Sequence, residues 1–412
     1  MASELIELKG HIIDSLSLPR VLDDILAQGG QFEIEEIDIG KTRPEPSYAR
    51  IRVSADSEQT LEDILAFVEK DGASRVWQWD AELAPAPRDG ILPDDFYCTT
   101  NLSTEVRIAG RWTPVQDIEM DCGIVVEDGV AKTVPMNLVL AGQIVVVGHR
   151  GVRVEPPERK EVPGAFEFMT SEVSAERPKG LIVQEIARAM VETKSRGEKV
   201  LLVGGPAIIH SGAGPCVERM IEDGRIDVLF AGNALPLHDI ESALFGTSLG
   251  VSVKEGRSSA HGHEHHLRAV NTIRKLGGIR QAVEQGVLKS GIMHACVEAG
   301  VPFVLAGSIR DDGPLPEVIT DTPRAQEEMR RKLKGVGFAL MAATVLHSIA
   351  TGNLLPARVK VACVDIDPAV VTKLIDRGTT QAMGVVTDVG LFLVELEQEL
   401  RRLAAGKVTS ER

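Results

Sequence analysis

Several common sequence signals are missing from this chain of 412 residues. It has no apolar run of about 18 residues, so we expect no membrane-spanning helix. The N-terminal stretch MASELIELKGHIID carries acidic residues and no long apolar core, which is not the pattern of a signal peptide. We find neither internal repeats nor low-complexity tracts. These absences favour a globular protein of the cytoplasm.

Cysteine is scarce, and its placement is as informative as its number. The five cysteines are scattered and include no CxxC pair. This predicts reduced thiols in a cytosolic protein and gives no spacing for a zinc site.

The formal net charge of −15 argues against nucleic acid or an anionic membrane surface as the main partner. A small-molecule substrate remains compatible with this charge, because a basic pocket can exist inside an acidic protein.

The standard glycine fingerprints of nucleotide-binding proteins are also absent. Neither GxGxxG nor GxxxxGK[ST] occurs, although GGPAIIHSGAG (204–214) follows an expected strand and precedes an expected helix. Backbone N–H groups in such a place can bind phosphate. A dinucleotide would therefore bind in a variant manner. We interpret Cys122, alone in a β segment, as a small core residue.

The first 160 residues predict two small modules. A β-α-β-β-α order is typical of a split βαβ module, which we place at residues 1–95. Short strands separated by turn signals then predict a β-rich module over residues 96–160. The elements expected in the first module are strands at 4–13, 31–40 and 48–54 and helices at 19–28 and 57–70.

From residue 161 onwards, short apolar runs alternate with helical patterns. This alternation predicts an α/β fold with a doubly wound, Rossmann-like parallel sheet over residues 161–412. Ligands of open α/β sheets bind outside the carboxyl ends of the strands, so we expect function in the loops that follow the strands. The clearest such loop is Ser308–Gly313, stiffened afterwards by Pro314 and Pro316. The expected strands are Val200–Val203, Asp227–Ala231, Val301–Ala306, Val336–Ala343, Val359–Val364 and Val385–Val386.

An acidic residue, Asp365, directly follows the apolar run VACV. A carboxylate at this place can accept hydrogen bonds from both ribose hydroxyls of an adenosine, and it would repel a 2′-phosphate. The sequence thus points to NAD rather than NADP. The alternative role, capping a helix, suits Asp367 better, because Pro368 follows at the first helical position.

Histidine is unevenly distributed: seven of the ten lie between His210 and His294, and four fall within AHGHEHHL (260–267). A metal site is one interpretation of this run. No cysteine or spaced carboxylate accompanies it, however, so it matches no closed zinc site. A polar loop is a second interpretation, and an acid–base role for one histidine is a third. We predict no metal.

Long unbroken motifs give the chain a resemblance to a known family. The C-terminal half resembles the archaeal-type ornithine cyclodeaminases and the similar C-terminal region of bifunctional arginine dihydrolase/ornithine cyclodeaminases. The N-terminal part is similar to the region named after lysine-ketoglutarate reductase/saccharopine dehydrogenase, in 6–25 and 96–126. The matching C-terminal stretches are 203–214, 227–250, 266–273, 290–321, 344–356 and 364–393.

This resemblance implies bound NAD and the conversion of L-ornithine to L-proline with loss of ammonia, in a protein we expect to be a homo-oligomer. Within the histidine run, His263 and His266 match the family pattern, whereas His261 and His265 depart from it. The implied cofactor contacts are Asn233, Ala234, Asp312, Thr344, Val345, Leu346, His347, Asp365, Asp388 and Val389.

The implied reaction is redox-neutral overall and needs three kinds of residue. The α-carbon must be held against the nicotinamide, an ammonium must lose a proton, and water must be kept from the imine. An arginine should bind the substrate carboxylate, and Arg107 and Arg310 are the candidates. The candidate bases are Asp312, His266 and Asp121.

Three other functions compete with this hypothesis. Another NAD-dependent amino-acid or imine oxidoreductase, such as an opine-type dehydrogenase, would change NADH absorbance with turnover. A non-enzymatic NAD or amino-acid sensor, with residues 1–72 as its regulatory module, would bind ligand and form no product. A metal hydrolase using the histidine run would be sensitive to chelators.

Overall fold

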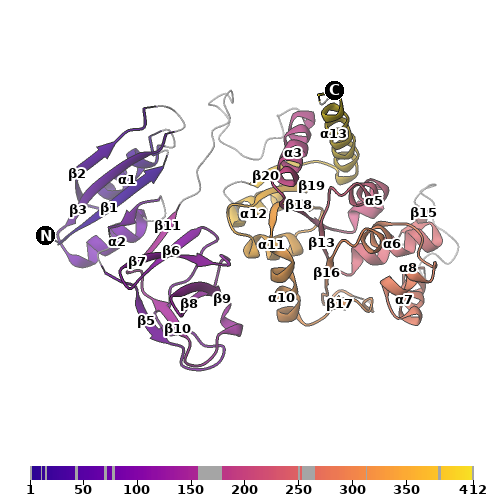
Figure 1. Ribbon diagram of the computed structural model, residues 1–412, viewed down its shortest axis with the longest axis horizontal. Helices are drawn as coiled ribbons and strands as arrows, with labels where there is room; N and C mark the ends of the chain where they lie inside the picture. The colour runs from indigo at the N-terminus through magenta and orange to yellow at the C-terminus, as the bar shows by residue number, and fades with distance from the viewer. Residues whose placement is uncertain are drawn as a thin grey trace. The chain divides into compact units, whose positions relative to one another are not determined.

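The computed structural model folds into two compact units, Met1–Ala165 and Phe166–Arg412 (Figure 1). Among the residues singled out from the sequence, His261, His263 and Asp312 lie outside the described part of the chain. No helix within that part is long and apolar enough to cross a membrane. The structure describes residues 2–10, 12–13, 16–41, 45–68, 72–76, 79–155, 179–248, 251–252, 265–311, 313–378 and 382–410.

The N-terminal unit begins with a four-stranded antiparallel sheet in the order β2-β3-β1-β4. Every second residue of β3, from Ser47 to Ala55, is buried beneath two helices, which is the period of a sheet with one covered face. The predicted first strand ends earlier than expected, at Gly10, and Ile13 is largely exposed. The elements are β1 (Ala2–Gly10), α1 (Ser17–Ala27), β2 (Gln31–Asp38), β3 (Ser47–Ala55), α2 (Glu58–Val68) and β4 (Ser74–Arg75).

A seven-stranded, mostly antiparallel sheet follows in the order β11-β6-β7-β9-β8-β10-β5. The interpretation of Cys122 as a core residue is confirmed, since only 2% of it is exposed. The strands are β5 (Glu82–Pro85), β6 (Ser103–Ile108), β7 (Arg111–Gln116), β8 (Gly123–Glu127), β9 (Val130–Val134), β10 (Ile144–Val147) and β11 (Val152–Glu155), with a 3-10 turn at Met136–Leu138.

The C-terminal unit is built on a seven-stranded sheet in the order β17-β16-β13-β12-β18-β19-β20, and every neighbouring pair is parallel. Without the two-residue β17, the chain order of the strands is 3-2-1-4-5-6, the order of a Rossmann sheet. The order reverses between β12 and β18. The strands are β12 (Lys199–Gly204), β13 (Val228–Ala231), β16 (Phe303–Ala306), β17 (Val318–Ile319), β18 (Val336–Ala342), β19 (Lys360–Asp365) and β20 (Ala382–Val386).

Helices cover both faces of this sheet, so the middle of each long strand is apolar on both sides. Val200 and Leu202 of β12 belong to one core, whereas Leu201 and Val203 belong to the other. This two-sided burial confirms the predicted doubly wound fold. A small hairpin, β14 (Thr247–Ser248) and β15 (Val251–Ser252), accompanies the helices. These are α3 (Lys179–Ser195), α4 (Ala207–His210), α5 (Gly214–Glu222), α6 (Ala234–Phe245), α7 (His265–Leu276), α8 (Ile279–Glu284), α9 (Ile292–Glu298), α10 (Thr322–Leu333), α11 (Leu346–Leu354), α12 (Pro368–Gly378) and α13 (Val389–Ser410).

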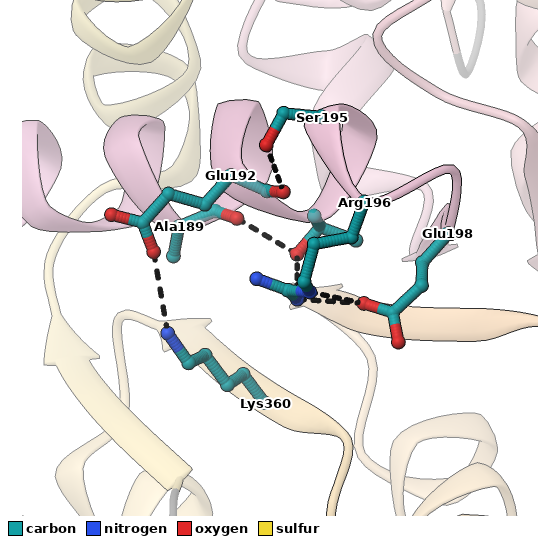
Figure 2. Close-up of polar contacts among 7 residues, drawn as sticks. Ala189, Glu192, Ser195, Arg196, Glu198 and Lys360 are labelled. Carbon is teal, nitrogen blue, oxygen red and sulfur yellow. Dashed lines mark hydrogen bonds and ion pairs between the residues drawn. The ribbon is translucent and has the colours of Figure 1, made fainter.

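The amino-terminal edge of the sheet is joined to α3 by polar contacts (Figure 2). Lys360, at the start of β19, lies with its Nζ 3.7 Å from Glu192 Oε2 of α3. Arg196, just after α3, donates from Nε to Glu198 Oε2 over 2.8 Å. These charged side chains therefore pair with one another, at the edge of the sheet opposite to the expected site.

Candidate functional site

The loops after β12 and β18 touch where the strand order reverses. Gly205 donates its N–H to the Ala342 carbonyl over 2.9 Å, and a Cβ added to Gly205 would stand 1.8 Å from the Ala343 carbonyl oxygen. Only glycine permits this approach. Ala343 itself has a φ of 53°, which turns the chain from β18 toward α11. The two loops thus form the topological switch point of the sheet, the place where open α/β sheets bind ligands.

His347, in the first turn of α11, links three of these loops. Its Nε2 lies 3.3 Å from the carbonyl oxygen of Ala306, at the end of β16, and its Nδ1 lies 3.4 Å from Thr344 Oγ1. A Cβ on Gly232, which follows β13, would lie 2.8 Å from the ring. Burial lowers the pKa of His347, against smaller raising effects of the Ala306 carbonyl and Asp311. A neutral ring fits both contacts, with Nε2–H donating and Nδ1 accepting.

Asp365 is the last residue of β19 and is partly exposed. Its Oδ1 accepts the backbone N–H of Asp367 over 3.0 Å, which fixes the carboxylate at the strand end. Asp367 in turn accepts the N–H of Ala369 over 2.9 Å, with Pro368 as the first residue of α12. The interpretation of Asp367 as a helix cap is thus confirmed. Beside them Ile366 is 72% exposed.

Two other expected cofactor residues already accept hydrogen bonds from the protein backbone. Asn233, which precedes α6, is buried and accepts the N–H of Leu315 through Oδ1 over 3.0 Å. Asp388 is exposed and accepts the N–H of Leu391 at the start of α13 over 2.9 Å. All nine described members of the expected cofactor set lie at or just after the carboxyl end of a strand: Asn233, Ala234, Thr344, Val345, Leu346, His347, Asp365, Asp388 and Val389.

The catalytic candidates are divided between the two units. Arg310 is exposed in the loop after β16, and His266 is half-buried in the first turn of α7. Arg107 lies in the N-terminal unit, with Nη1 3.4 Å from Asp80 Oδ1. Asp121 belongs to the same unit and is exposed, with a φ of 61°. Among the described residues, no three histidine, cysteine, aspartate or glutamate side chains lie where they could hold a metal ion.

A buried polar cluster on α6 was missed by the sequence reasoning. His238 Nδ1 lies 3.0 Å from Glu241 Oε2, and the Thr247 hydroxyl donates to Glu241 Oε1 over 2.9 Å. The ring of His210, from α4, lies 4.8 Å from the ring of His238. The available signal was the spacing: residues three apart on a helix share a face, so His238 and Glu241 could have been paired in advance.

Three family models together cover most of the chain. The model described as "Arginine dihydrolase ArgZ-like, C-terminal, Rossmann fold" matches residues 184–396. The first region of the same C-terminal part matches residues 103–183. The LOR/SDH bifunctional enzyme conserved region matches residues 3–102.

Curated relatives match along the whole chain. The ornithine cyclodeaminase of Methanothermobacter thermautotrophicus is 54% identical, over 98% of this chain and 99% of its own length. The bifunctional arginine dihydrolase/ornithine cyclodeaminase AgrE of Nostoc sp. is 43% identical over 99% of this chain, which spans 59% of AgrE.

Two solved structures are similar to this chain over most of its length. The putative LOR/SDH protein of Methanococcus maripaludis is 51% identical, with a TM-score of 0.76, over 79% of this chain and 99% of its own. The ternary complex of AgrE with ornithine and NAD⁺ is 42% identical, with a TM-score of 0.55, over 98% of this chain and 58% of AgrE. From the Rossmann-fold model and the full-length relatives, we conclude that the chain belongs to the archaeal-type ornithine cyclodeaminase family.

Proposed function

We propose that this protein is an NAD-dependent ornithine cyclodeaminase, which converts L-ornithine to L-proline and ammonia. The observation that carries the proposal is the carboxyl edge of the parallel sheet, where a glycine contact at the switch point lies near a strand-end carboxylate, Asp365. Family membership supports the same activity, because curated relatives carry the name and AgrE has been crystallised with ornithine and NAD⁺.

The residues at this edge fit a dinucleotide. Gly205 and Gly232 let the loops that would surround it pack closely together, since an added Cβ would meet Ala343 or His347. Asp365 would accept hydrogen bonds from the adenosine ribose, and the exposed side chain of Ile366 would lie against the adenine. The backbone at the start of α11 would bind the pyrophosphate, as helix N-termini do.

The position of the acid also indicates which way the cofactor lies. In the usual Rossmann arrangement the ribose acid follows the second strand of the first half. That strand is β13 here, and Gly232-Asn233 follows it without a carboxylate. Asp365 instead ends β19, the second strand of the second half. The adenosine would therefore lie over β18 and β19, and the nicotinamide toward β12 and β13.

The chain's own residues would do the remaining work around the substrate. When bound, NAD⁺ accepts a hydride from the α-carbon of ornithine and returns it after ring closure. Arg310, exposed after β16, is the candidate in this unit for binding the substrate carboxylate. Arg107 is a second candidate for that role, and Asp312, His266 and Asp121 are the candidate bases.

The test is to incubate the purified protein with L-ornithine and NAD⁺. Proline and ammonia should form in equal amounts, while the absorbance of NADH does not rise. Accumulating NADH would instead indicate another amino-acid or imine oxidoreductase. Bound NAD without product would indicate a sensor. We expect the enzyme to act in the cytoplasm as a homo-oligomer.

A further inference from the structure

The cluster on α6 buries a carboxylate completely. The side chain of Glu241 is 0% exposed and that of His238 is 9% exposed. Removing a carboxylate from water is costly unless hydrogen bonds replace the water. Both Glu241 oxygens have such bonds, one from Thr247 and the other with His238.

The hydrogen bonds fix where the protons lie. Because the Thr247 hydroxyl donates to Glu241, it can accept from His265 Nδ1, which is 2.8 Å away. An ionised Glu241 can only accept, so His238 donates from Nδ1. In the neutral form of the ring, the other nitrogen, Nε2, then carries the lone pair. A carboxylate that orients a histidine in this way is the usual arrangement of a catalytic base.

The cluster lies on the half of the sheet to which the reacting end of the cofactor is assigned above. His238 is the fifth residue of α6, the helix that begins directly after the carboxyl end of β13 (Figure 1). Its ring meets that of His210, from α4, the helix that follows β12. His210 is exposed, and its Nδ1 lies 2.7 Å from Ser248 Oγ. The cluster therefore reaches from buried Glu241 to an exposed histidine.

We propose that His238 transfers protons in the cyclodeaminase reaction and that Glu241 is its positioning residue. This inference rests on the proposed function. His238 Nε2 takes a proton from the α-ammonium of L-ornithine, and the α-carbon then loses hydride to the NAD⁺ that the proposed function supplies. The δ-ammonium loses a proton to solvent, and the resulting amine forms a bond to the α-carbon and loses a second proton. The His238 imidazolium returns its proton to the α-nitrogen, and the bond from the α-carbon to that nitrogen breaks with its electron pair leaving on ammonia, while the lone pair of the ring nitrogen forms a C=N bond. The returning hydride reduces this bond, and the ring nitrogen regains a proton.

This sequence balances. The α-carbon is oxidised when it loses the hydride and reduced when the hydride returns to the ring carbon. The proton released by the δ-ammonium ends on ammonia, so the ornithine cation gives proline and ammonium. His238 finishes in its starting state. No co-reactant beyond NAD⁺ is required.

The test uses the NAD-loaded full chain. His238→Ala should lower kcat by about 10²-fold or more, the usual contribution of a general base. Dissociation constants for NAD⁺ and ornithine, measured by calorimetry, should stay within about threefold of wild type. Added imidazole should restore part of the turnover of this variant and leave the wild type unchanged. Glu222→Gln, an exposed substitution at the end of α5, is the matched control for Glu241→Gln.

Glu241→Gln should lower kcat by about tenfold or more with little change in KM. Nitrogen NMR of ¹⁵N-histidine protein gives a readout independent of turnover: neutral His238 should carry its proton on Nδ1, and Glu241→Gln should shift this tautomer toward Nε2–H.

Wild-type turnover in His238→Ala would overturn the inference and leave the proposed function standing. Lost NAD binding without imidazole rescue would overturn it too, in favour of a structural link between α6 and β14. A wild type that forms no proline would overturn both proposals.

Discussion

The two edges of the C-terminal sheet use polar side chains in opposite ways. At the amino edge, charges pair with one another, as in Lys194–Asp227, Arg196–Glu198 and Glu192–Lys360. At the carboxyl edge, the chain places glycines in contact with neighbouring loops and leaves apolar side chains such as Leu346 exposed. The same strands thus begin beside ion pairs at one edge and end in groups open to a ligand at the other.

The residues that stabilise the fold and those that would bind the cofactor are therefore expected at different edges of the sheet. Substitutions at the amino edge should change the free energy of unfolding and leave cofactor affinity alone. Substitutions at the carboxyl edge should change cofactor affinity, and they should affect stability only where the loops are in direct contact.

The largest effect is expected for Gly205→Ala. The added Cβ would stand 1.8 Å from the Ala343 carbonyl oxygen, so the two loops must move apart. Overpacking of this kind costs about 1–3 kcal/mol, and NAD⁺ affinity should fall strongly as well. Chemical denaturation and calorimetry measure the two effects. Gly352→Ala is the control: it has nothing within 4 Å of its added Cβ and lies inside α11, so it should stabilise by about 0.5–1 kcal/mol. Equal behaviour of the two variants would contradict the switch-point contact.

Asp365→Ser should weaken NAD⁺ binding next most. Hydrogen bonds to a charged group contribute about 1.5–3 kcal/mol, which corresponds to roughly 10- to 100-fold in affinity. NADP⁺ should bind better than before, because a repelling charge is removed. Dissociation constants for both cofactors test this. Asp367→Ser keeps a helix cap two residues away and should leave both constants unchanged. Unchanged NAD⁺ affinity in Asp365→Ser would remove this residue from the ribose site.

Asp227→Ala tests the amino edge. It removes the ion pair with Lys194 and the acceptor of the Val200 N–H, which is 2.9 Å away. Unfolding should become easier by about 1–2 kcal/mol, because a backbone donor loses its partner. Glu192→Gln, which breaks an exposed pair, should cost less than about 0.5 kcal/mol. A clear loss of NAD⁺ affinity in either variant would break the proposed separation of the two edges.

The smallest effect concerns pH. Burial lowers the pKa of His347 in the folded protein, so the unfolded chain binds more protons just below the ordinary value of 6.5. The free energy of unfolding should therefore rise with pH up to about that value, through this residue. His347→Gln should lack this part of the pH dependence. Denaturation series between pH 5 and about pH 8 measure it, and an unchanged slope in the variant would show that His347 is not held neutral.

The sheet was predictable from sequence, because its strands are apolar runs of strand length that end in glycine or an acid. The functional edge followed from the same pattern, and Asp365 was found because it ends such a run. The strand order was not predictable, since it depends on pairings between distant segments such as β12 with β18. The two-residue strands β14 and β17 carry no periodicity and were missed for that reason.

Side-chain clusters were harder to predict than loops. His238 and Glu241 share a helix, but the third member, Thr247, comes from a hairpin whose position only the fold defines. Arg107 and Asp121 fall in a different predicted module from Arg310 and His266, and the structure likewise puts the two pairs in different compact units. The sequence analysis therefore named the carboxyl edge, which stays a prediction, and a scattered set of catalytic candidates.

The most direct test of the account is the fate of the α-hydrogen of ornithine. L-[2-²H]ornithine should be incubated with the protein and unlabelled NAD⁺, and the proline analysed by mass spectrometry and proton NMR. We expect proline that retains deuterium at C2, because the hydride taken from the α-carbon returns to the same carbon within one closed site. Proline without deuterium at C2, or deuterium accumulating in free NADH, would contradict a cofactor that is recycled at the carboxyl edge.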